Sequence, residues 1–547
     1  MLQYSYTQGG LMKIELSINK RYLLIPISKK GTTTLISIFN NDNKIYEFMI
    51  PVLQDSILYE VDYYSYIPVS KWMNQSIVIE SESPACFFQQ FSFSNELPDS
   101  QTGRPQIHFT PSSGWINDPN GLIYKDGIYH LYFQHNPFHV EWGNMSWGHA
   151  VSTDLLHWKQ LENVMFPDSD GTIFSGCGLV NENKLLDLPS DALLFFYTSA
   201  GNTSNWSQNK AFTQNLAYSL DAGKSLIKQG TCILPHIAGE NRDPKIYWHS
   251  KSNNYYMVLY LEENDFAIFT STDLNHWKMT QRLTFPNAWE CPDLREIPIE
   301  GGGSKWMFWT ADGYYYLGEF DGEMFSMDGL QQEAYSSKLP YAAQTFYGTD
   351  RLISIPWFRT TNSKEIYRGM MGLPRQLSLT ERNGSLILRQ KPIDEYETSK
   401  KLVCENISSY LHQQNSPFEV AFDILPSVDF SLNACSVACV LTNNSLKIVQ
   451  SDGTHELPLL ENYQKLSFLF DQSILEITID DGIAFGAYEL HNDTLCGEIL
   501  INSSDSTKLN SKIYTLDNTV DGKPLRKSFA FPQSRQSPLD NKHNKTR

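Results

Sequence analysis

Residues 108–158 read HFTPSSGWINDPNGLIYKDGIYHLYFQHNPFHVEWGNMSWGHAVSTDLLHW. The centre of this stretch, WINDPNG (115–121), holds a carboxylate between two amides, next to a Pro and a Gly. Because Pro and Gly disfavour the interior of a strand, we expect a rigid turn there. The β-like runs 122–124 and 128–134, joined by an Asp-Gly turn, predict a β-hairpin directly after it. Asp118 is therefore expected where a strand begins.

Asp118 has two possible roles in such a turn. It could bond only to nearby backbone groups, as Asp commonly does in turns. It could also belong to a saccharide site, because aromatic rings cover the apolar face of a sugar while polar groups bind its hydroxyls. The side chains of the same stretch that favour the second role are Trp115, Trp142, Trp147, Trp158, His130, His135, His149 and Asn117.

The composition of the chain narrows the class of protein and of partner. At 547 residues the chain is too long for one ordinary core, so we expect two or three domains. The 61 acidic residues outnumber the 43 basic ones, which gives a formal charge of −18. Such a charge argues against nucleic acid or an anionic membrane as a partner and favours a neutral ligand.

The cysteines and the apolar runs predict the compartment. Eight dispersed cysteines without a CxxC pair are typical of reduced thiols inside a cell, although their even number leaves a disulfide open. The chain does not begin with a basic leader and an apolar run, and no apolar run is long enough to span a bilayer. We therefore expect a cytoplasmic protein. Metal-ligand spacings and phosphate-binding glycine loops are absent from the sequence, so we expect neither a metal nor a cofactor.

The region 13–95 is predicted to form a β-rich module of its own. Carbohydrate binding and simple packing are both open as its role. If translation starts at Met12, residues 1–11 would be an unstructured excess. The polar segment 94–106 marks the first domain boundary. The predicted strands of the module are the short β-like runs 13–17, 22–27, 33–39, 45–50, 57–63, 76–80 and 87–93.

An internal repeat predicts the fold of the region 107–390. The sequence STDLLHWK at 152–159 returns as STDLNHWK at 271–278, with a degraded copy, SLDAGK, at 219–224. Each copy follows a β-like run, and the copies recur roughly every fifty to seventy residues, which is typical of propeller blades. At that period the region accommodates about five blades. The predicted fold class is thus all-β, with a five-bladed β-propeller whose inner strands meet at one axial cavity.

Two further acids occur in settings like that of Asp118. Asp243 lies in Asn-Arg-Asp-Pro (241–244), which opens one predicted strand, and Glu290 lies between an indole and a Cys-Pro turn in AWECPDL (288–294). Each acid taken singly could belong to a surface turn or an ion pair. Together, near the starts of strands that converge in a propeller, they predict an acidic centre.

These motifs, in this order, resemble glycoside hydrolase family 32, the β-fructofuranosidase family of invertases, levanases and inulinases. The resemblance covers 107–390. It rests on WINDPNG with the downstream WGNMSWGHAVSTDLLHW, and on FSG (174–176), RDP (242–244), ECPDL (290–294), YAAQTF (341–346) and LPRQLSL (373–379).

The rest of the chain contains a further predicted domain, a linker and a tail. The runs 466–477 and 480–482 resemble the family's C-terminal β-sandwich, which we expect over 402–533. The charged segment 391–401 is a predicted linker with a short helix. Residues 534–547 are polar and nearly free of large apolar side chains, so we expect a disordered tail. The N-terminal module lies outside the resemblance.

The resemblance implies a retaining glycosidase and assigns roles to the three acids. Asp118 is the implied nucleophile, and Glu290 is the implied acid that protonates the leaving oxygen and then activates water. Asp243, with Arg242, is implied to bind the ring hydroxyls and to stabilise the transition state. One departure is Leu339-Pro340, where the family commonly has Asp-Phe, and the contribution of that Asp is therefore in doubt. The other positions that match the family's sugar pocket are Asn117, Gln134, Trp142, Phe174, Ser175 and Trp357.

The implied activity is release of terminal β-D-fructofuranosyl residues from fructans, fructo-oligosaccharides or sucrose. A pentosidase on a similar five-bladed propeller is a second hypothesis, and the WINDPNG and ECPDL motifs weigh against it. A non-catalytic sugar-binding protein is a third, and the presence of all three acids weighs against that. The sequence distinguishes neither among levan, inulin and sucrose nor among oligomeric states.

Overall fold

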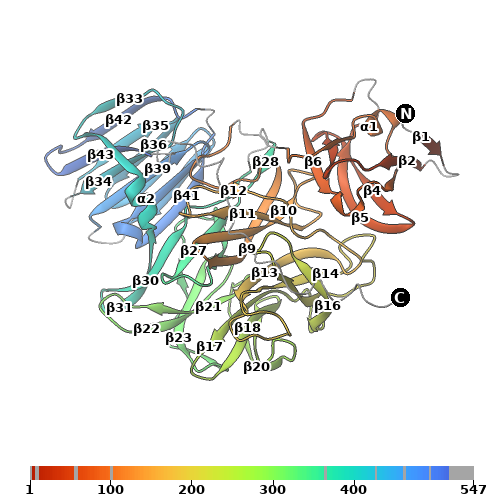
Figure 1. The fold of residues 1–547 in the computed structure, drawn as a ribbon. Coiled ribbons are helices and arrows are strands. Elements are labelled where there is room, and N and C mark those ends of the chain that lie inside the picture. The colour runs from red at the N-terminus through yellow and green to blue at the C-terminus, as the bar shows by residue number, and fades with distance from the viewer. Residues whose placement is uncertain are drawn as a thin grey trace.

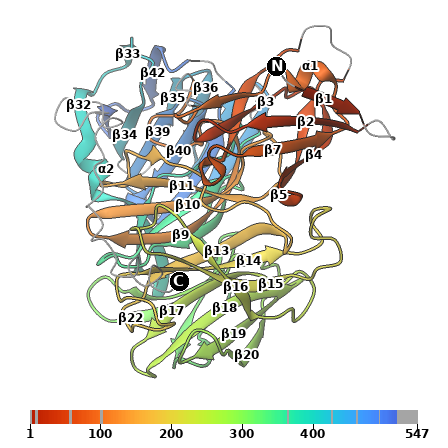
Figure 2. The ribbon, with the colours of Figure 1, turned by 45° about the vertical axis from the view of Figure 1, so that its right-hand side comes forward.

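The computed structural model describes residues 3–6, 11–54, 59–98, 103–361, 366–424, 428–459, 463–491 and 494–516. Within them the protein is all-β, and its sheets form three groups along the chain (Figure 1, Figure 2). The predicted tail, 534–547, and the end of the predicted C-terminal region, 517–533, lie outside the described residues. Neither α-helix of the described part has the length and hydropathy of a membrane span.

The N-terminal group packs two antiparallel sheets around one core. The first sheet has the order β1-β2-β7-β4-β5, so that β5 is an edge strand, and the second has the order β6-β3-β8. Apolar side chains that alternate along the strands of both sheets, such as Ile14, Ile25 and Ile79, fill this core. The elements are β1 (Gln3–Tyr6), β2 (Met12–Ser17), β3 (Tyr22–Ile27), β4 (Thr32–Asn40), β5 (Asn43–Val52), β6 (Tyr63–Pro68), a 3-10 turn (Ser70–Trp72), β7 (Ser76–Ser81), α1 (Ala85–Phe88) and β8 (Ser92–Ser94).

The N-terminal predictions were wrong at three places. The predicted strand 87–93 begins in α1, where Phe87 and Phe88 both pack into the core, and a strand forms only at β8. The predicted strand 57–63 is misplaced, since β6 begins at Tyr63, and 57 and 58 lie outside the described residues. Residues 3–6 pair antiparallel with β2, so the expectation of an unstructured segment is wrong for these four residues. The other five predicted runs lie within β2, β3, β4, β5 and β7.

The central group consists of five sheets of four or five strands each, formed one after another along the chain. Their first strands lie against one another: β13 contacts β9 and β17, and β26 contacts β9. The sheets contain β9 (Gly114–Lys125), β10 (Ile128–Asn136), β11 (Ser146–Ser152), β12 (Lys159–Gln160) and β28 (Tyr367–Arg368); β13 (Thr172–Val180), β14 (Leu193–Ala200), β15 (Thr213–Ser219) and β16 (Ile227–Leu234); β17 (Arg242–His249), β18 (Asn254–Glu262), β19 (Asp265–Ser271) and β20 (Lys278–Thr284); β21 (Asp293–Pro298), β22 (Ser304–Trp309), β23 (Tyr314–Phe320), β24 (Phe325–Met327) and β25 (Gln332–Glu333); and β26 (Pro340–Thr345), β27 (Ile353–Phe358), β29 (Met370–Met371), β30 (Arg375–Arg382) and β31 (Ser385–Pro392).

The internal repeat occupies the same place in three successive sheets. In each copy the first residue of the repeat is the last residue of the sheet's third strand. These residues are Ser152 on β11, Ser219 on β15 and Ser271 on β19. In the two full copies the Asp accepts a hydrogen bond from the His ring, at 2.7 Å for Asp154 and 2.6 Å for Asp273. The repeated residues therefore build the turn between the third and fourth strands, which explains why the sequence recurs once per sheet.

The C-terminal group packs two six-stranded antiparallel sheets around another core, and α2 (Asp394–Ser399) precedes it. The short helix predicted in 391–401 is thus confirmed. The sheets have the orders β32-β43-β34-β39-β40-β41 and β33-β42-β35-β36-β37-β38. Their strands are β32 (Lys400–Glu405), β33 (Ser409–His412), β34 (Phe418–Ile424), β35 (Phe430–Ala434), β36 (Val437–Thr442), β37 (Ser445–Gln450), β38 (Gly453–Pro458), β39 (Lys465–Asp471), β40 (Ile474–Ile479), β41 (Ala484–Glu489), β42 (Gly497–Ser503) and β43 (Leu509–Leu516).

A buried network of charged side chains joins the C-terminal group to the central sheets. The two ring nitrogens of His108 lie 2.9 Å from Asp471, on β39, and 3.0 Å from Glu476, on β40. Arg375, on β30, donates to the same Glu476. All four side chains are 1% exposed or less. We call this set of four the charged contact.

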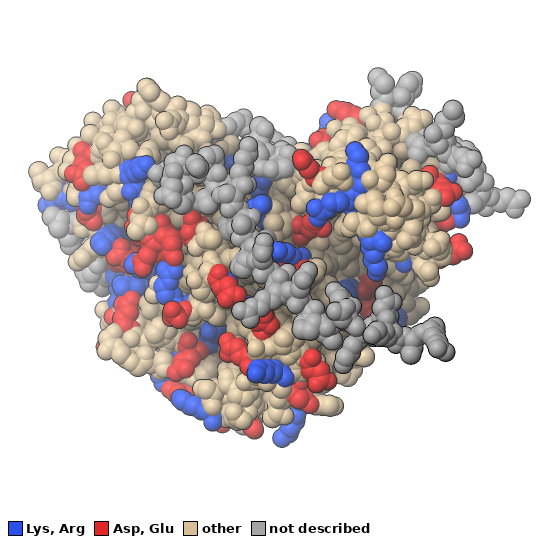
Figure 3. All heavy atoms as spheres, viewed as in Figure 1, with Lys and Arg blue, Asp and Glu red and all other residues tan. Residues whose placement is uncertain are grey.

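Charged groups are distributed differently on the surface. On the face shown in Figure 3, Lys and Arg side chains are interspersed with Asp and Glu side chains.

All eight cysteines lie in the described part of the chain, and all are free thiols there. The prediction of reduced, dispersed cysteines agrees with this arrangement.

Candidate active site

A cavity of about 380 Å³ is lined by residues of the central sheets, on their first and second strands and in the loops that connect strands. All ten residues that the sequence predicted for the site are among its lining residues, and five others join them. The lining residues are Asn117, Asp118, Gln134, Trp142, Met145, Phe174, Ser175, Thr203, Phe212, Glu240, Arg242, Asp243, Glu290, Tyr341 and Trp357.

Asp118 lies inside a strand, not in a turn before one. The whole WINDPNG motif belongs to β9, so the expectation of a turn was wrong. The pairing of β9 with β10 shifts register twice, once after Asn120 and once before Pro119. Such β-bulges tolerate Pro119, which has no N–H to donate, and Gly121, whose φ is 51°. A bulge also redirects side chains, and Asp118 lies within the second one, between Ile116 and Pro119.

β-bulges also occur in other strands that line the cavity. Register shifts occur in β13 before Gly176, in β17 after Arg242 and in β26 after Tyr341. Bulges are common beside active sites because they aim side chains. A positive φ, sparsely populated for residues other than Gly, adds strain in the bulges of β17 and β26 and in the loop before β21. The residues concerned are Asp243 (64°), Glu290 (23°), Cys291 (45°) and Ala342 (49°).

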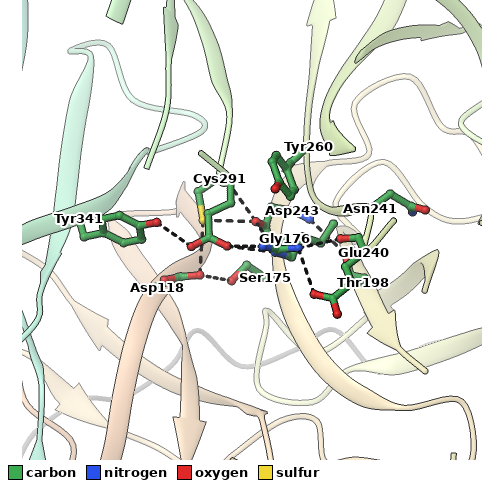
Figure 4. A network of polar contacts seen from close by, with 12 residues as sticks. Asp118, Ser175, Gly176, Thr198, Glu240, Asn241, Asp243, Tyr260, Cys291 and Tyr341 are labelled. Carbon is green, nitrogen blue, oxygen red and sulfur yellow. Dashed lines mark hydrogen bonds and ion pairs between the residues drawn. The ribbon is translucent and has the colours of Figure 1, made fainter. Parts of the chain in front are cut away.

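The carboxyl group of Asp118 is held by two donors. Ser175 Oγ donates to Oδ2 over 2.6 Å, and the Cys291 thiol lies 3.5 Å from the same oxygen (Figure 4). Burial, followed by the negative charge of Glu290, raises the pKa of Asp118, and the hydrogen bond from Ser175 opposes that rise. Burial also raises the pKa of the Cys291 thiol, which therefore stays neutral and can donate.

Glu290 is held from two sides in the loop before β21. Arg242 donates to Oε2 through Nε, at 3.0 Å, and through Nη2, at 2.7 Å, which is a charge-assisted pair with fixed geometry. The Tyr341 hydroxyl donates to Oε1 over 2.8 Å. Burial and then the charge of Glu290 raise the pKa of Tyr341, so that this phenol remains a donor. The guanidinium of Arg242 also lies over the Tyr260 ring, 4.5 Å from its centre, which limits its motion.

Asp243 is 3% exposed, and the Cys291 thiol lies near both its Oδ2, at 3.4 Å, and Oδ2 of Asp118. The Asp243 Oδ2 accepts from the backbone N–H of Cys291 at 3.1 Å, and Arg242 Nε lies 3.8 Å away. Burial raises the pKa of Asp243 to about 7, because Arg242 only partly opposes burial and the charges of Glu290 and Asp118 add to it. Asp243 can therefore gain or lose a proton near neutral pH, beside two further carboxyl groups.

Two predicted binding residues have buried polar atoms without a partner among the described residues. These are both side-chain polar atoms of Gln134 and the indole N–H of Trp357. Buried polar groups are normally paired, so unpaired ones beside a cavity indicate where a ligand binds. Asn117 is oriented by Trp115, whose Nε1 donates to its Oδ1 over 2.8 Å. Trp142 is 55% exposed and lies at the mouth of the cavity.

Several other aromatic residues of 108–158 do not reach the cavity. Trp147 is fully buried and donates to the Phe174 carbonyl, while His130 and His149 stack on each other inside the first sheet. The aromatic content of this stretch thus reflected core packing as well as the site. In the described ranges no group of three or more His, Cys, Asp or Glu is arranged to hold a metal ion.

The sequence analysis did not predict five of the lining residues. Tyr341 lies in the YAAQTF motif, and Glu240 directly precedes the Asn-Arg-Asp-Pro motif, so motif position was an available signal for both. The other three, Met145, Thr203 and Phe212, lie in loops whose place in space no local pattern predicts. At the departure Leu339-Pro340, Pro340 begins β26 and the next residue, Tyr341, holds Glu290.

Paired buried carboxyls beside a cavity of this size are the chemical groups of a glycosidase. The model of the glycosyl hydrolases family 32 N-terminal domain matches residues 108–392, which is about half of the chain. The chain belongs to glycosyl hydrolase family 32. It is therefore an enzyme that hydrolyses O-glycosyl bonds.

Curated relatives agree with this family. The chain is 31% identical over 353 residues to a levanase of Bacillus subtilis (strain 168), which covers 56% of this chain and 50% of the levanase. It is 30% identical over 465 residues to the extracellular exo-inulinase inuE of Meyerozyma guilliermondii. This match covers 70% of this chain and 89% of the exo-inulinase. It is 33% identical over 375 residues to an invertase of Wickerhamomyces anomalus. This match covers 60% of this chain and 66% of the invertase. The match thus spans half of the levanase but most of the exo-inulinase.

Solved structures show the same fold. The exo-inulinase of Aspergillus awamori superimposes with a TM-score of 0.69 at 23% identity, over 76% of this chain and 99% of that structure. A glycoside hydrolase family 32 structure from Bifidobacterium adolescentis superimposes with a TM-score of 0.64 at 17% identity, over 92% of this chain and 99% of that structure.

Proposed function

We propose that the protein is a retaining, exo-acting β-fructofuranosidase. Its substrates would be fructans such as levan and inulin, fructo-oligosaccharides and sucrose, from which it releases terminal β-D-fructofuranosyl residues. The observation that carries this proposal is the convergence of Asp118, Asp243 and Glu290 on one buried cavity. The names of the levanase, exo-inulinase and invertase relatives support the fructose-containing substrate.

The architecture we propose has three domains. The five central sheets would be the blades of a five-bladed β-propeller over 107–390, with β9, β13, β17, β21 and β26 around its axis. The N-terminal module would cover 13–95, and a C-terminal β-sandwich would cover 402–533. A cytoplasmic location and the absence of a cofactor, a nucleic-acid partner and a membrane partner stay predictions.

The first half-reaction forms a covalent intermediate. A carboxylate oxygen of Asp118 bonds to the anomeric carbon while the bond from that carbon to the leaving oxygen breaks. Glu290 gives its proton to the leaving oxygen. The bond from Ser175 to Oδ2 fixes the Asp118 carboxylate for the attack. Asp243 would accept hydrogen bonds from ring hydroxyls and stabilise the positive charge that develops on the sugar.

The second half-reaction releases fructose. Glu290, now ionised, takes a proton from a water molecule, and the water oxygen bonds to the anomeric carbon as the bond to Asp118 breaks. Two displacements at one carbon retain its configuration. Arg242 and Tyr341 hold both oxygens of Glu290, so that the same group can serve in both steps.

Fructose release from levan, inulin and sucrose, beside a pentoside control, tests the substrate class, and Glu290→Ala tests the mechanism. We expect this variant to lose about 10²–10⁴-fold in kcat on sucrose and fructans, whose leaving oxygens need a proton. It should be far less impaired on a fructoside with a good leaving group. Added azide, which needs no general base, should speed the second step and give a β-fructosyl azide.

The matched control is Glu319→Ala, which removes a carboxylate that is 65% exposed on β23. That variant should behave as the wild type. Equal impairment of a folded Glu290→Ala on every leaving group, with no azide product, would remove Glu290 from the acid–base role. Release of pentose but not fructose by the wild type would replace the proposed substrate.

A further inference from the structure

Two chain segments form one side of the mouth of the cavity. The segment 137–145 connects β10 to β11 and contributes Trp142 and Met145 to the lining, and the segment 201–212 connects β14 to β15 and contributes Thr203 and Phe212. We call them the first and second mouth segments. Both are contacted by the N-terminal sheets, and in each case the contact is made by the edge strand β5.

The first mouth segment completes the hydrogen bonding of β5. An edge strand presents backbone N–H and C=O groups that lack a neighbouring strand. Here the side-chain amide of Asn144 accepts from the Met49 N–H and donates to the Met49 carbonyl, both over 2.8 Å. Asn144 thus acts as a single residue of a neighbouring strand. Its amide nitrogen also lies 3.0 Å from Asn136 Oδ1, at the end of β10, so the contact leads back to a strand of the first central sheet.

The first mouth segment also completes the core of the N-terminal sheets. Phe138 and Val140 are buried in that core, at 0% and 7% exposure. The ring of Phe138 stacks on Phe48 of β5, with centres 4.1 Å apart and planes 15° from parallel. The conformation of 137–145 therefore depends on packing against β5, because without it two large apolar side chains would face water.

The second mouth segment is held by a buried carboxylate on the same strand. Glu47 Oε1 accepts from the backbone N–H of Trp206 over 2.7 Å, and its other oxygen pairs with Lys44. The Glu47 side chain is 2% exposed, which is unusual for a Glu unless it is paired. The ammonium group of Lys44 lies 5.6 Å from the centre of the Trp206 ring. Glu47, Phe48 and Met49 are consecutive, so three neighbouring residues of β5 hold both segments.

The two mouth segments meet in a row of aromatic rings. Phe174, on β13, is the middle ring of this row. Trp142, of the first mouth segment, lies edge-on to it with ring centres 5.9 Å apart. Phe212, of the second mouth segment, also lies edge-on to it, with ring centres 5.6 Å apart. Trp142 is the exposed end of this row and Phe212 the buried end. The row therefore runs from the mouth inward along one wall, where saccharide units that extend out of the cavity would pass.

We propose that β5 is a positioning element for this wall: through Glu47 and Met49 it holds the two mouth segments and thereby sets the affinity for saccharide units beyond the terminal fructosyl residue. This proposal rests on the proposed function for its substrate. Glu47 and Asn144 are positioning residues that act through Trp142, Phe174 and Phe212. The N-terminal sheets then have a role in substrate selection and not only in stability.

Substitutions at the two contacts test the proposal. Glu47→Ala removes the acceptor of the Trp206 N–H, Glu47→Gln keeps an acceptor oxygen, and Asn144→Gly removes the bonds to Met49 at a residue whose φ of 45° Gly adopts freely. Because each loses one or two hydrogen bonds, we expect KM for inulin to rise about two- to tenfold in Glu47→Ala and Asn144→Gly. KM for sucrose and kcat on both substrates should stay within about twofold, because the acids are untouched. Glu47→Gln, which keeps the acceptor oxygen, should leave KM for inulin near the wild-type value.

The control is Glu80→Ala on β7, which removes a Glu of the same sheet whose partner is Lys13 on β2. Hydrogen exchange of 137–145 and 201–212, measured without substrate, should increase in Glu47→Ala and Asn144→Gly and stay unchanged in Glu80→Ala. Unchanged exchange, or a loss of kcat on both substrates that follows melting temperature, would overturn the proposal. If the wild type releases no fructose from any substrate, the proposed function fails, while the exchange result still shows whether β5 holds the segments.

Discussion

Both ends of the chain pack apolar side chains against the central sheets, but the buried polar groups that join them there differ. The C-terminal sheets use the charged contact, in which His108, Arg375, Asp471 and Glu476 are buried together. The N-terminal sheets use stacked rings, a side-chain amide and a single buried carboxylate, at Phe48, Asn144 and Glu47. Among the described residues that line the cavity none belongs to the charged contact, whereas the N-terminal contact ends on segments that line it.

This difference separates two tasks. A contact of buried charges tolerates little change, because removing one partner leaves the others unpaired in a medium of low dielectric constant. Such a contact fixes the relative position of two groups of sheets. A contact of rings and single hydrogen bonds is weaker at each point and can be altered one residue at a time. The second kind suits a surface that shapes a binding site.

The largest expected effect would break the charged contact. Arg375→Met removes the cation beside Glu476 and should lower the free energy of unfolding of the C-terminal transition by about 3–5 kcal/mol. Glu47→Ala at the N-terminal contact should lower stability by only about 1.5–3 kcal/mol, the range for a hydrogen bond to a charged group. Urea unfolding followed by fluorescence and circular dichroism compares the two. Equal losses would mean that the two contacts do not differ in kind.

The pH dependence of stability gives the next largest effect. Burial lowers the pKa of His108, but the hydrogen bonds and charges of Asp471 and Glu476 outweigh burial and raise it to about 9, from 6.5. A pKa raised by folding stabilises the folded state below the unfolded value and loses that stabilisation as pH rises through the folded value. We therefore expect the wild type to lose about 2–3 kcal/mol between pH 7 and pH 10.

His108→Gln is the control for this loss, since Gln has no proton to release. Its stability should fall less steeply than that of the wild type over the same range, because this one titration is absent. A wild type and a variant with the same slope would show that the charged contact does not titrate.

Another effect of pH concerns Asp243, a buried carboxyl group that belongs to neither contact, and its pH dependence has the same sign as that of His108. The pKa of Asp243 is raised from 3.8 to about 7, so ionisation of this group destabilises the folded state above pH 7 and not below pH 4. Asp243→Asn should therefore raise the free energy of unfolding at pH 8 by up to about 4 kcal/mol, and the gain should vanish toward pH 4. Thermal melts of both proteins from pH 4 to pH 8 measure it. A variant less stable than the wild type at pH 8 would contradict the expectation.

Motifs predicted the site better than local patterns predicted the strands that carry it. All ten predicted site residues line one cavity, because each motif fixes a residue type at a strand and the sheets bring the strands together. The turn predicted for WINDPNG was wrong, since the rule that Pro and Gly interrupt strands ignores β-bulges. The helix α1 was missed because its apolar residues, Phe87 and Phe88, are common in strands.

Contacts between distant segments could not be predicted from the sequence. Nothing near Glu47 indicates that it accepts from Trp206, which lies 159 residues further along the chain. The same holds for Asn144, whose amide pairs with a strand 95 residues before it. Such contacts depend on how whole sheets pack, and local periodicity contains no information about that packing.

The first mouth segment, 137–145, has a consequence for attempts to change the substrate range. Phe138 and Val140 belong to one hydrophobic core, while Trp142 and Met145 line the cavity, so this loop serves both folding and binding within a few residues. A library that randomises the whole loop would discard most of its members as misfolded. Grafting the loop from a relative without an N-terminal module would bring in side chains that do not fit the core here. Diversity confined to position 142, where the side chain is 55% exposed, would vary the cavity without disturbing the core.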